Sequence, residues 1–356
     1  MKIIHCADLH LGSKMESKLP HAKALERREE ILHNFDRLAK WASLNNVKII
    51  LISGDLLDTD NTTLATKEYI LNVIKTYDNI VFVYLCGNHD KNSLLRKGDM
   101  PKNLFNFDEN WKSFDCGENV VITGKEGQLS TNDYASLTLD ANNFNIVALH
   151  GQEFVGQKQD GEILNLNALK NKNINYLALG HIHSFKIDTL DEHGVYAYSG
   201  CLEGRGFDEC GAKGFVLLEI ENKNLKTTFV PFMQREYVEV EVDITNLVTF
   251  REILNKCNEV LSEYNSKDII RIVLCGDYNI ETDKNLTLLK HELENKFYFV
   301  DIKDKSTLFI SHETYENEIS LTGEFIRQVK ASNLSPELKD EVIARGLRIL
   351  KEARKW

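Results

Sequence analysis

The sequence Gly87-Asn88-His89-Asp90 follows directly on the apolar run Ile80 to Cys86, so an amide, an imidazole and a carboxylate stand where a buried strand is expected to end. Residues of metal-binding types also follow four other apolar runs. They are Asp8 and His10 after residues 3–7, Asp55 after 49–54, His150 after 146–149, and His181 and His183 after 176–180. In α/β folds, ligands bind beyond the carboxyl ends of the strands, so the five ends are predicted to converge on one crevice.

The first part of the chain alternates predicted strands and helices. Residues 2–7, 47–53 and 80–86 are typical of buried strands, and the spacing of apolar residues predicts amphipathic helices over 22–45 and 62–77. This order implies parallel strands joined by right-handed crossovers. A surface excursion is expected over 94–119.

The next part is predicted to add a second sheet and so to complete a sandwich. Strands are expected at 120–122, 135–139, 146–149 and 176–179, with a loop over 152–161 and a short helix over 164–170. Residues 185–190, 195–199 and 215–220 are typical of antiparallel strands, with a hairpin turn at 191–194.

Composition shifts near Val230 and Pro231, where a new unit is predicted to begin. Its pattern is strand 237–243, helix 247–264, strand 269–274, helix 283–294 and strand 298–301, followed by helical segments over 325–329 and 336–354. The predicted division is therefore 1–230 for a main α/β domain, 231–320 for a small α/β cap and 321–356 for a C-terminal helical segment.

Composition limits the classes of function. The chain has 356 residues, of which 42% are hydrophobic, enough for a packed core. The net charge of −11 argues against bulk electrostatic binding of nucleic acid, so a DNA substrate would need a metal site or a partner to supply positive field. Seven cysteines without a Cys-x-x-Cys pair indicate reduced thiols. With neither a signal-peptide pattern nor an apolar run near 18 residues, a cytoplasmic protein with no membrane segment is expected.

The residues after the apolar runs have the ligand types of a two-metal phosphoesterase site. Two divalent cations about 3.5 to 4 Å apart can activate water and stabilise both the attacking and the leaving oxygen in phosphoester hydrolysis. The predicted bridging ligand is Asp55, with Asp8, His10 and His183 around one ion and Asn88, His150 and His181 around the other. Imidazoles mixed with carboxylates suit Mn²⁺, Fe or Zn, and we favour Mn²⁺ because no cysteine lies at a motif position.

Neighbouring residues are assigned other tasks. His89 adjoins a ligand but cannot easily share its metal, so we expect it to act as general acid or charge stabiliser for the leaving oxygen. Asp58 and Asp90 are expected to fix imidazole tautomers or the shape of the loops. Arg205, flanked by glycines, is either a phosphate contact or an exposed loop arginine without a specific partner.

Each ligand also has an ordinary structural interpretation. A lone Asp55 after a strand is commonly a turn former, and a lone His150 is commonly a hydrogen-bonded core residue. His5 falls inside its apolar run and is predicted to be a core residue. Five separate segments that each end in a suitable ligand nevertheless favour the metal site.

The motifs Asp-x-His-x-Gly at 8–12, Gly-Asp-x-x-Asp at 54–58, Gly-Asn-His-Asp at 87–90, the single His150 and Gly-His-x-His at 180–183 resemble those of the calcineurin-like metallophosphoesterase superfamily. Residues 4–12 and 198–209 are similar to the SbcD branch, the nuclease subunits of SbcCD-type DNA repair complexes, which includes bacterial YhaO-like proteins. The resemblance covers about residues 1–230. It implies a four-layered α/β/β/α sandwich, two Mn²⁺ ions, and exonuclease or endonuclease action on DNA ends, single-stranded DNA or hairpins.

The resemblance also implies partners. It places an SMC-like ATPase of the SbcC type on the segment 321–356 and DNA against the cap, and a second copy of the chain is a further candidate partner. Apolar residues of the terminal segment offer anchors for a partner, and they are Phe325, Ile326, Val329, Leu334, Leu338, Val342, Ile343, Leu347 and Leu350. The alternative is that these helices pack on their own domain.

Two rival functions stay open. One is a small-molecule phosphodiesterase or phosphomonoesterase with the same dinuclear site, which the acidic net charge favours. The other is a regulatory subunit of an ATPase complex whose site is idle, which the intact ligand set counts against.

Overall fold

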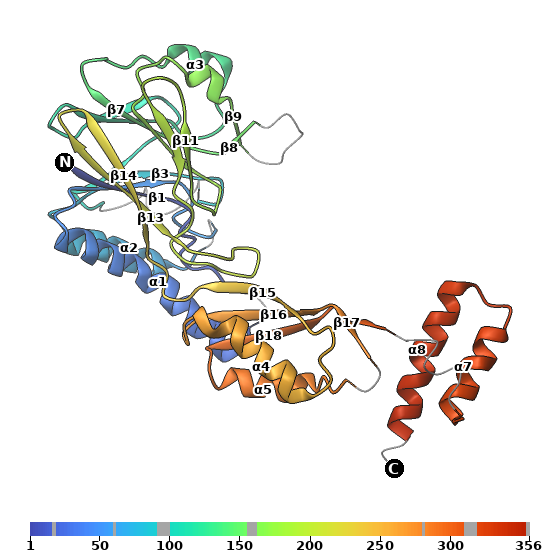
Figure 1. Cartoon of the computed structure of the whole chain (residues 1–356). Coiled ribbons are helices and arrows are strands. Elements are labelled where there is room, and N and C mark those ends of the chain that lie inside the picture. Colours follow the sequence, from blue (N-terminus) through green and yellow to red (C-terminus); the bar gives the residue numbers. More distant parts are fainter. Residues whose placement is uncertain are drawn as a thin grey trace. The chain divides into compact units, whose positions relative to one another are not determined.

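The structure is a computed structural model that describes residues 1–15, 19–59, 62–90, 100–154, 162–279, 282–309 and 319–353. The chain folds into two compact units, Met1–Glu236 and Tyr237–Trp356 (Figure 1).

The first unit contains a six-stranded sheet with the order β14-β13-β1-β2-β3-β4. The strands β1 (Lys2–Cys6), β2 (Ile49–Ser53), β3 (Val81–Leu85) and β4 (Leu104–Asn106) are parallel. β13 (Gly214–Glu221) pairs antiparallel with β1, and β14 (Asn224–Pro231) pairs antiparallel with β13. The predicted parallel pairing of the first three strands is confirmed.

A second six-stranded sheet in the same unit has the order β11-β12-β10-β7-β6-β5. Its inner strands β6 (Val120–Gly124), β7 (Phe144–His150), β10 (Tyr176–Gly180) and β12 (Val195–Tyr198) are parallel. The edges are antiparallel additions, β5 (Lys112–Asp115) and β11 (Lys186–Thr189). A short parallel pair, β8 (Gln152–Glu153) and β9 (Ile163–Leu164), follows the end of β7.

Side-chain alternation along the strands builds the layers, because successive residues of a strand point to opposite faces. On β1, Ile3 packs toward the second sheet, whereas Ile4 packs against the helices α1 (His21–Leu44) and α2 (Leu64–Thr76). The outer face of the second sheet is covered by α3 (Thr131–Ser136) and the 3₁₀ turn η2 (Leu166–Leu169).

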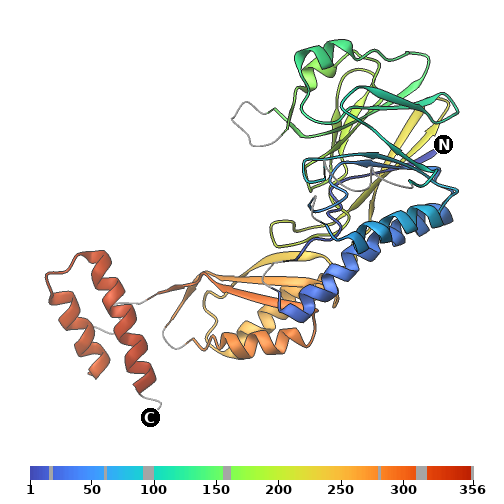
Figure 2. The ribbon, with the colours of Figure 1, turned by 180° about the vertical axis from the view of Figure 1, so that it is seen from behind.

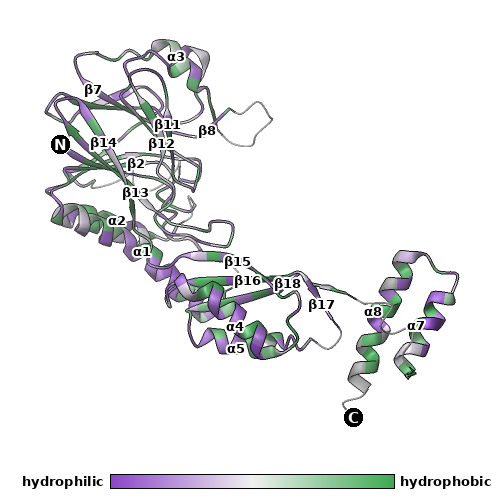
Figure 3. Ribbon diagram, viewed as in Figure 1, coloured by the Kyte–Doolittle hydropathy of each residue, from purple (hydrophilic) through white to green (hydrophobic). Residues whose placement is uncertain are grey.

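Figures 1 and 2 show α1 and α2 side by side along one flank of the sandwich, and Figure 3 shows apolar strands within it. The central strands are buried on both faces, which explains why their sequences are continuous apolar runs. The predicted α/β sandwich, with two mixed sheets flanked by helices, is confirmed.

Two sequence predictions in this unit are wrong, and a third is right about the strand but not about its sheet. Residues 135–139 do not form a strand: 135–136 end α3, which the capping box of Ser130 and Asp133 starts, and 137–139 have no regular structure. Of the predicted surface excursion over 94–119, residues 94–99 lie outside the described residues, and 100–119 contain β4 and β5, which extend one sheet each. Residues 215–220 do form an antiparallel strand, β13, but it joins β1 in the first sheet and not the second. Part of the predicted 152–161 loop, 155–161, lies outside the described residues.

The first unit continues past β14 to Glu236. The main chain of Phe232 bonds to that of Lys213, and the amides of Gln234 and Arg235 donate to the buried carboxylate of Glu203. These bonds tie residues 232–235 to the sandwich.

The second unit has a parallel sheet with the order β15-β16-β18, made of Tyr237–Asp243, Ile269–Cys275 and Phe299–Asp304. The helix α4 (Phe250–Val260), the turn η3 (Leu261–Glu263) and the helix α5 (Leu286–Glu294) share a core with it. A small parallel pair, β17 (Asp277–Tyr278) and β19 (Thr307–Leu308), follows the ends of β16 and β18. The predicted alternation of strand and helix is confirmed.

The last described segments are α7 (Leu321–Ala331) and α8 (Pro336–Ala353). They pack on each other through Ile326, Val329, Ile343 and Leu347. Gly346 allows the close approach, since a Cβ atom there would lie 2.1 Å from the Phe325 ring. None of the helices in the described part of the chain combines the length and the apolarity that a membrane span requires.

Candidate metal centre

The loops that carry the predicted ligands are tied together by hydrogen bonds of the main chain just beyond the strand ends. The amide of Asp8 donates to Gly54 O (3.1 Å), and that of His10 donates to Asp55 O (3.0 Å). The amide of His181 donates to both carboxylate oxygens of Asp8 (2.9 and 3.0 Å). Ends of strands from both sheets therefore converge, as the sequence predicted.

Several of these residues have left-handed backbones, which non-glycine residues rarely adopt. The φ angles are +54° at Asp8, +44° at His10, +49° at Asp55 and +95° at His181. Such conformations cost about 1 to 3 kcal/mol each and persist where the surroundings enforce them, commonly at functional sites. Three of the four, Asp8, His10 and Asp55, belong to clusters of donor atoms that could hold a cation.

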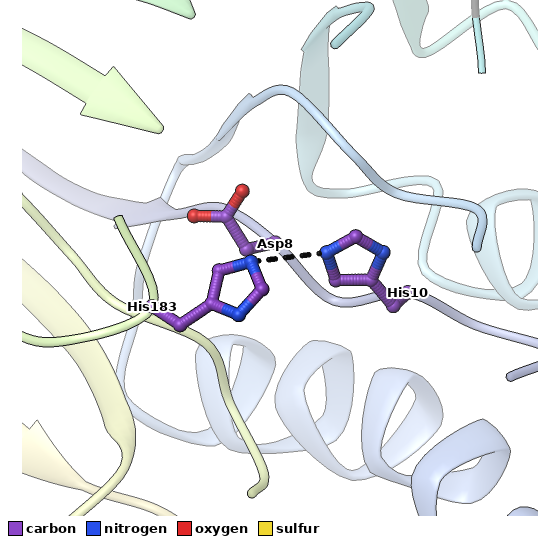
Figure 4. Close-up of side chains that lie close together, drawn as sticks. All are labelled: Asp8, His10 and His183. Atoms are coloured by element: carbon purple, nitrogen blue, oxygen red, sulfur yellow. Dashed lines mark hydrogen bonds between the residues drawn. The ribbon is translucent and has the colours of Figure 1, made fainter. Parts of the chain in front are cut away.

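The first ligand cluster contains Asp8, His10 and His183, whose donor atoms all lie within 4.8 Å of one another (Figure 4). Asp8 and His10 are buried, and the two imidazoles face each other with their Nε2 atoms 3.3 Å apart. Figure 4 shows Asp8 beside this contact.

The protonation of the two rings tests whether this cluster fits a cation. Nδ1 of His183 lies 2.7 Å from Glu209 Oε1, and Nδ1 of His10 lies 3.4 Å from Asp58 Oδ1. A carboxylate can only accept, so Nδ1 of His183 carries the proton, and in the neutral ring its Nε2 has a lone pair. Nδ1 of His10 is buried without a hydrogen bond. Nε2 of His183 lies 3.3 Å from Nε2 of His10 and within reach of the Asp8 carboxylate, so nitrogen and oxygen donors meet at one place. The donor set therefore fits a divalent cation.

The second cluster contains Asp8, Asp55 and His150. Nδ1 of buried His150 donates to Ser53 O (2.9 Å), so Nε2 faces Asp55 Oδ2 at 3.4 Å and Asn88 Oδ1 at 3.1 Å. Burial lowers the pKa of His150, but the Asp55 carboxylate outweighs this and raises the pKa to about 9. Nε2 therefore lies where positive charge is favoured, and a cation bound here would replace its proton.

Two carboxylates lie between the imidazoles. Asp8 belongs to both clusters, and Asp55 Oδ2 lies 3.4 Å from His150 Nε2 and 3.9 Å from His10 Nε2. Burial would raise the pKa of Asp55, yet contacts with His150 and His10 hold it well below the usual range. The Asp55 carboxylate is therefore ionised and near the imidazoles of both clusters; that it bridges two ions stays a prediction.

The remaining predicted ligands flank the second cluster. The His181 ring meets that of His150 edge to face, with ring centres 5.4 Å apart, and its pKa is lowered by burial and by His150. The exposed amide of Asn88 contacts His150. Three glycines leave room for the ligands: a Cβ atom on Gly54 or Gly180 would strike His150, and one on Gly87 would strike Asp55.

His89 is exposed and lies beside residues of both clusters. Its amide donates to Asp55 Oδ1 (3.0 Å), its Nδ1 contacts Asp58 O (2.8 Å), and its ring meets that of His10 with centres 5.0 Å apart. The backbone carbonyl accepts the Nδ1 proton, so in the neutral ring Nε2 carries the lone pair.

Asp90 is buried and shapes the loop that carries Asn88. Its carboxylate accepts from the amides of Gly87 (2.8 Å) and Leu57 (3.2 Å) and from the Tyr84 hydroxyl. Burial raises the pKa of this carboxyl group. Of the two tasks considered for Asp90, these bonds correspond to the shaping of the loop.

Arg205 lies in a network with two carboxylates. Its Nη1 donates to Asp58 Oδ1 (3.0 Å), and its Nη2 donates to Glu209 Oε1 (2.9 Å). Glu209 was not among the predicted site residues, because no apolar run precedes it. The only available signal was its place at the end of the segment 198–209.

Comparisons with known proteins agree with this geometry. A family model described as calcineurin-like phosphoesterase matches residues 1–185. The Bacillus subtilis protein named uncharacterized metallophosphoesterase YhaO is 25% identical, over 95% of this chain and 89% of its own. A subunit of the nuclease SbcCD from Staphylococcus epidermidis is 27% identical over 72% of this chain and 77% of its own. DNA double-strand break repair protein Mre11 of Sulfolobus acidocaldarius is 22% identical over 92% of this chain and 91% of its own.

Proposed function

Because this chain belongs to the calcineurin-like phosphoesterase family, we propose that it is a Mn²⁺-dependent phosphodiesterase that cleaves DNA, as the nuclease subunit of an SbcCD-type complex. The observation that carries the metal chemistry is the pair of donor clusters that share Asp8. When bound, two divalent cations supply Lewis-acid activation of the phosphoester and of the attacking water.

The chain's own residues supply position and proton transfer. Asp8, His10 and His183 would hold one ion, and Asn88, His150 and His181 the other. Asp55, which lies near His10 and His150, would be shared, and Asp8 lies within reach of both clusters. His89 lies outside both clusters, with Nδ1 held by Asp58 O, so in its doubly protonated form Nε2 can give a proton to the departing sugar oxygen. General acid catalysis of this kind contributes about 10² to 10⁴-fold to rate.

The proposal of DNA as substrate rests on the relatives. Two of the three are named as part of a nuclease and as a DNA double-strand break repair protein. The net charge of −11 opposes unaided binding to a polyanion, so contacts with phosphates need the bound cations or a partner. An SMC-like ATPase of the SbcC type is the proposed partner, and DNA ends, single strands or hairpins are the proposed substrates.

The test is hydrolysis by the purified chain with Mn²⁺, using labelled single-stranded, duplex and hairpin DNA beside a small chromogenic phosphodiester. DNA cleavage that Asn88→Ala abolishes is the expected result. Asn142→Ala is the matched control, because Asn142 is an exposed asparagine on the turn before β7, and it should cleave like the wild type.

The acidic charge favours a second candidate, a small-molecule phosphodiesterase or phosphomonoesterase with the same site. Cleavage of the small diester alone, unchanged when the ATPase partner is added, would select this candidate over the DNA nuclease. Bound metal without turnover of any phosphoester would select a catalytically idle subunit and overturn both.

A further inference from the structure

The two metal clusters differ in what orients their imidazoles. In the second cluster, His150 is held by main chain, since Nδ1 donates to Ser53 O at 2.9 Å. In the first cluster, both imidazoles face side-chain carboxylates: His183 Nδ1 lies 2.7 Å from Glu209 and His10 Nδ1 lies 3.4 Å from Asp58. The imidazoles of the first cluster are thus supported by side chains, and each of these side chains can be replaced by mutation without changing a ligand.

Arg205 joins these two supports. Its guanidinium donates to Asp58 Oδ1 through Nη1 and to Glu209 Oε1 through Nη2 and Nε, at 3.0, 2.9 and 3.2 Å. Nη2 also lies 3.3 Å from His183 Nδ1, and the two nitrogens share Glu209 Oε1 as their acceptor. The Arg205 amide donates to Glu209 Oε2 at 2.8 Å. Both oxygens of Glu209 are therefore engaged, so this carboxylate is held against the His183 ring and kept from turning toward a cation.

Charge and burial favour the same arrangement. The side chain of Glu209 is 7% exposed, and those of Asp58 and Arg205 are 21% exposed. The guanidinium offsets one of the two negative charges, and the net charge left behind the two imidazoles favours a nearby cation.

We infer that Glu209, Asp58 and Arg205 form a positioning network that sets the cation affinity of the cluster Asp8, His10 and His183, while the His150 ring is oriented by main chain outside that network. This deepens the proposed function, since it rests on the same dinuclear site. A carboxylate that accepts the Nδ1 proton fixes the ring's tautomer and orientation and makes its Nε2 more basic. Loss of such a partner commonly lowers metal affinity about 10- to 100-fold.

The first test is a Mn²⁺ titration of the metal-free chain by calorimetry. Glu209→Gln is expected to weaken one of the two binding steps about 10- to 100-fold and to leave the other unchanged. Asp208→Asn is the matched control, because Asp208 is an exposed carboxylate one residue away and its replacement changes the net charge equally. Equal weakening by both variants, or two unchanged steps in Glu209→Gln, would overturn the inference.

The second test reads the rings directly and does not depend on activity. In ¹⁵N NMR spectra of the metal-free chain, His183 is expected to be the Nδ1–H tautomer, and Glu209→Gln is expected to mix the two tautomers. Arg205→Lys should weaken the same binding step less than Arg205→Met, because a lysine can still neutralise a carboxylate but cannot bond to both. A His183 tautomer that is unchanged in Glu209→Gln would overturn the inference.

The two proposals fail separately. A wild-type chain that binds two ions but cleaves no DNA, even with the ATPase partner present, would refute the proposed substrate and leave the network intact. A Glu209→Gln variant with two unchanged binding steps would refute the network while DNA cleavage still held.

Discussion

Replacement of Gly54 by alanine is expected to disable the metal centre although it replaces none of the predicted ligands. Gly54 follows β2 with φ +101°, and a Cβ atom there would lie 1.9 Å from Nδ1 of His150. That is about 1.5 Å short of the 3.4 Å at which ordinary van der Waals contact begins. The imidazole must therefore move by roughly that distance or give up its bond to Ser53 O.

A misplacement of about 1 Å near reacting groups can cost about 10²-fold in rate. We therefore expect Gly54→Ala to lower turnover of a phosphodiester by at least about 10²-fold and to weaken the binding of one Mn²⁺ ion. The backbone strain of an alanine at this φ adds about 1 to 3 kcal/mol of destabilisation, which thermal unfolding would show.

A control variant at Gly127 separates the displacement of the His150 ring from the backbone strain of an alanine at positive φ. Gly127 also has a positive φ, +77°, but a Cβ atom there would meet nothing within 4 Å. Gly127→Ala should be destabilised in the same way and keep wild-type turnover and metal binding. Turnover and two bound ions in a folded Gly54→Ala variant would refute the assignment of His150 as a ligand.

Three further predictions concern pH, proton transfer and the partner. The metal-free chain is expected to lose stability as the pH rises through 9, because folding raises the pKa of His150 from 6.5 to about 9. The stabilisation by protonated His150 is complete only below pH 6.5 and is lost as the folded protein gives up this proton. Thermal unfolding at about pH 6 and pH 10 measures the loss, and a Mn²⁺-loaded chain should not show it. His89→Ala is expected to keep two ions and lose about 10²-fold or more in DNA cleavage, whereas His193→Ala, which alters an exposed turn, should keep both the two ions and wild-type cleavage; nearly full activity of His89→Ala would contradict its role. Deletion of the residues after Thr322 is expected to abolish pull-down of an SMC-like ATPase, and retained binding would place the docking surface elsewhere.

The sequence predicted which side chains come together where strands and candidate ligands are linked locally. A buried parallel strand needs a continuous apolar run, and a ligand directly after the run must emerge at the sheet's carboxyl edge. Asp8, Asp55 and His150 were found in this way, and their donor atoms do form one cluster.

What the sequence did not predict depends on contacts that are distant along the chain or on weak local signals. Arg205 meets Asp58 across 147 residues, and Glu209 follows no strand, so no periodicity indicates either contact. The strands β4 and β5 are short and largely exposed, which leaves no apolar run to detect. The Ser130 and Asp133 capping box starts α3 just before the residues predicted as a strand, so 135–136 are helical.

The most direct test of the account is the number of Mn²⁺ ions bound per chain, measured by elemental analysis after dialysis, in the wild type and in Asp55→Asn. Two ions in the wild type and fewer in the variant are predicted, because the Asp55 carboxylate lies between His10 and His150. One ion or none in the wild type would contradict the dinuclear centre, and two ions in Asp55→Asn would contradict the assignment of Asp55 as its bridge.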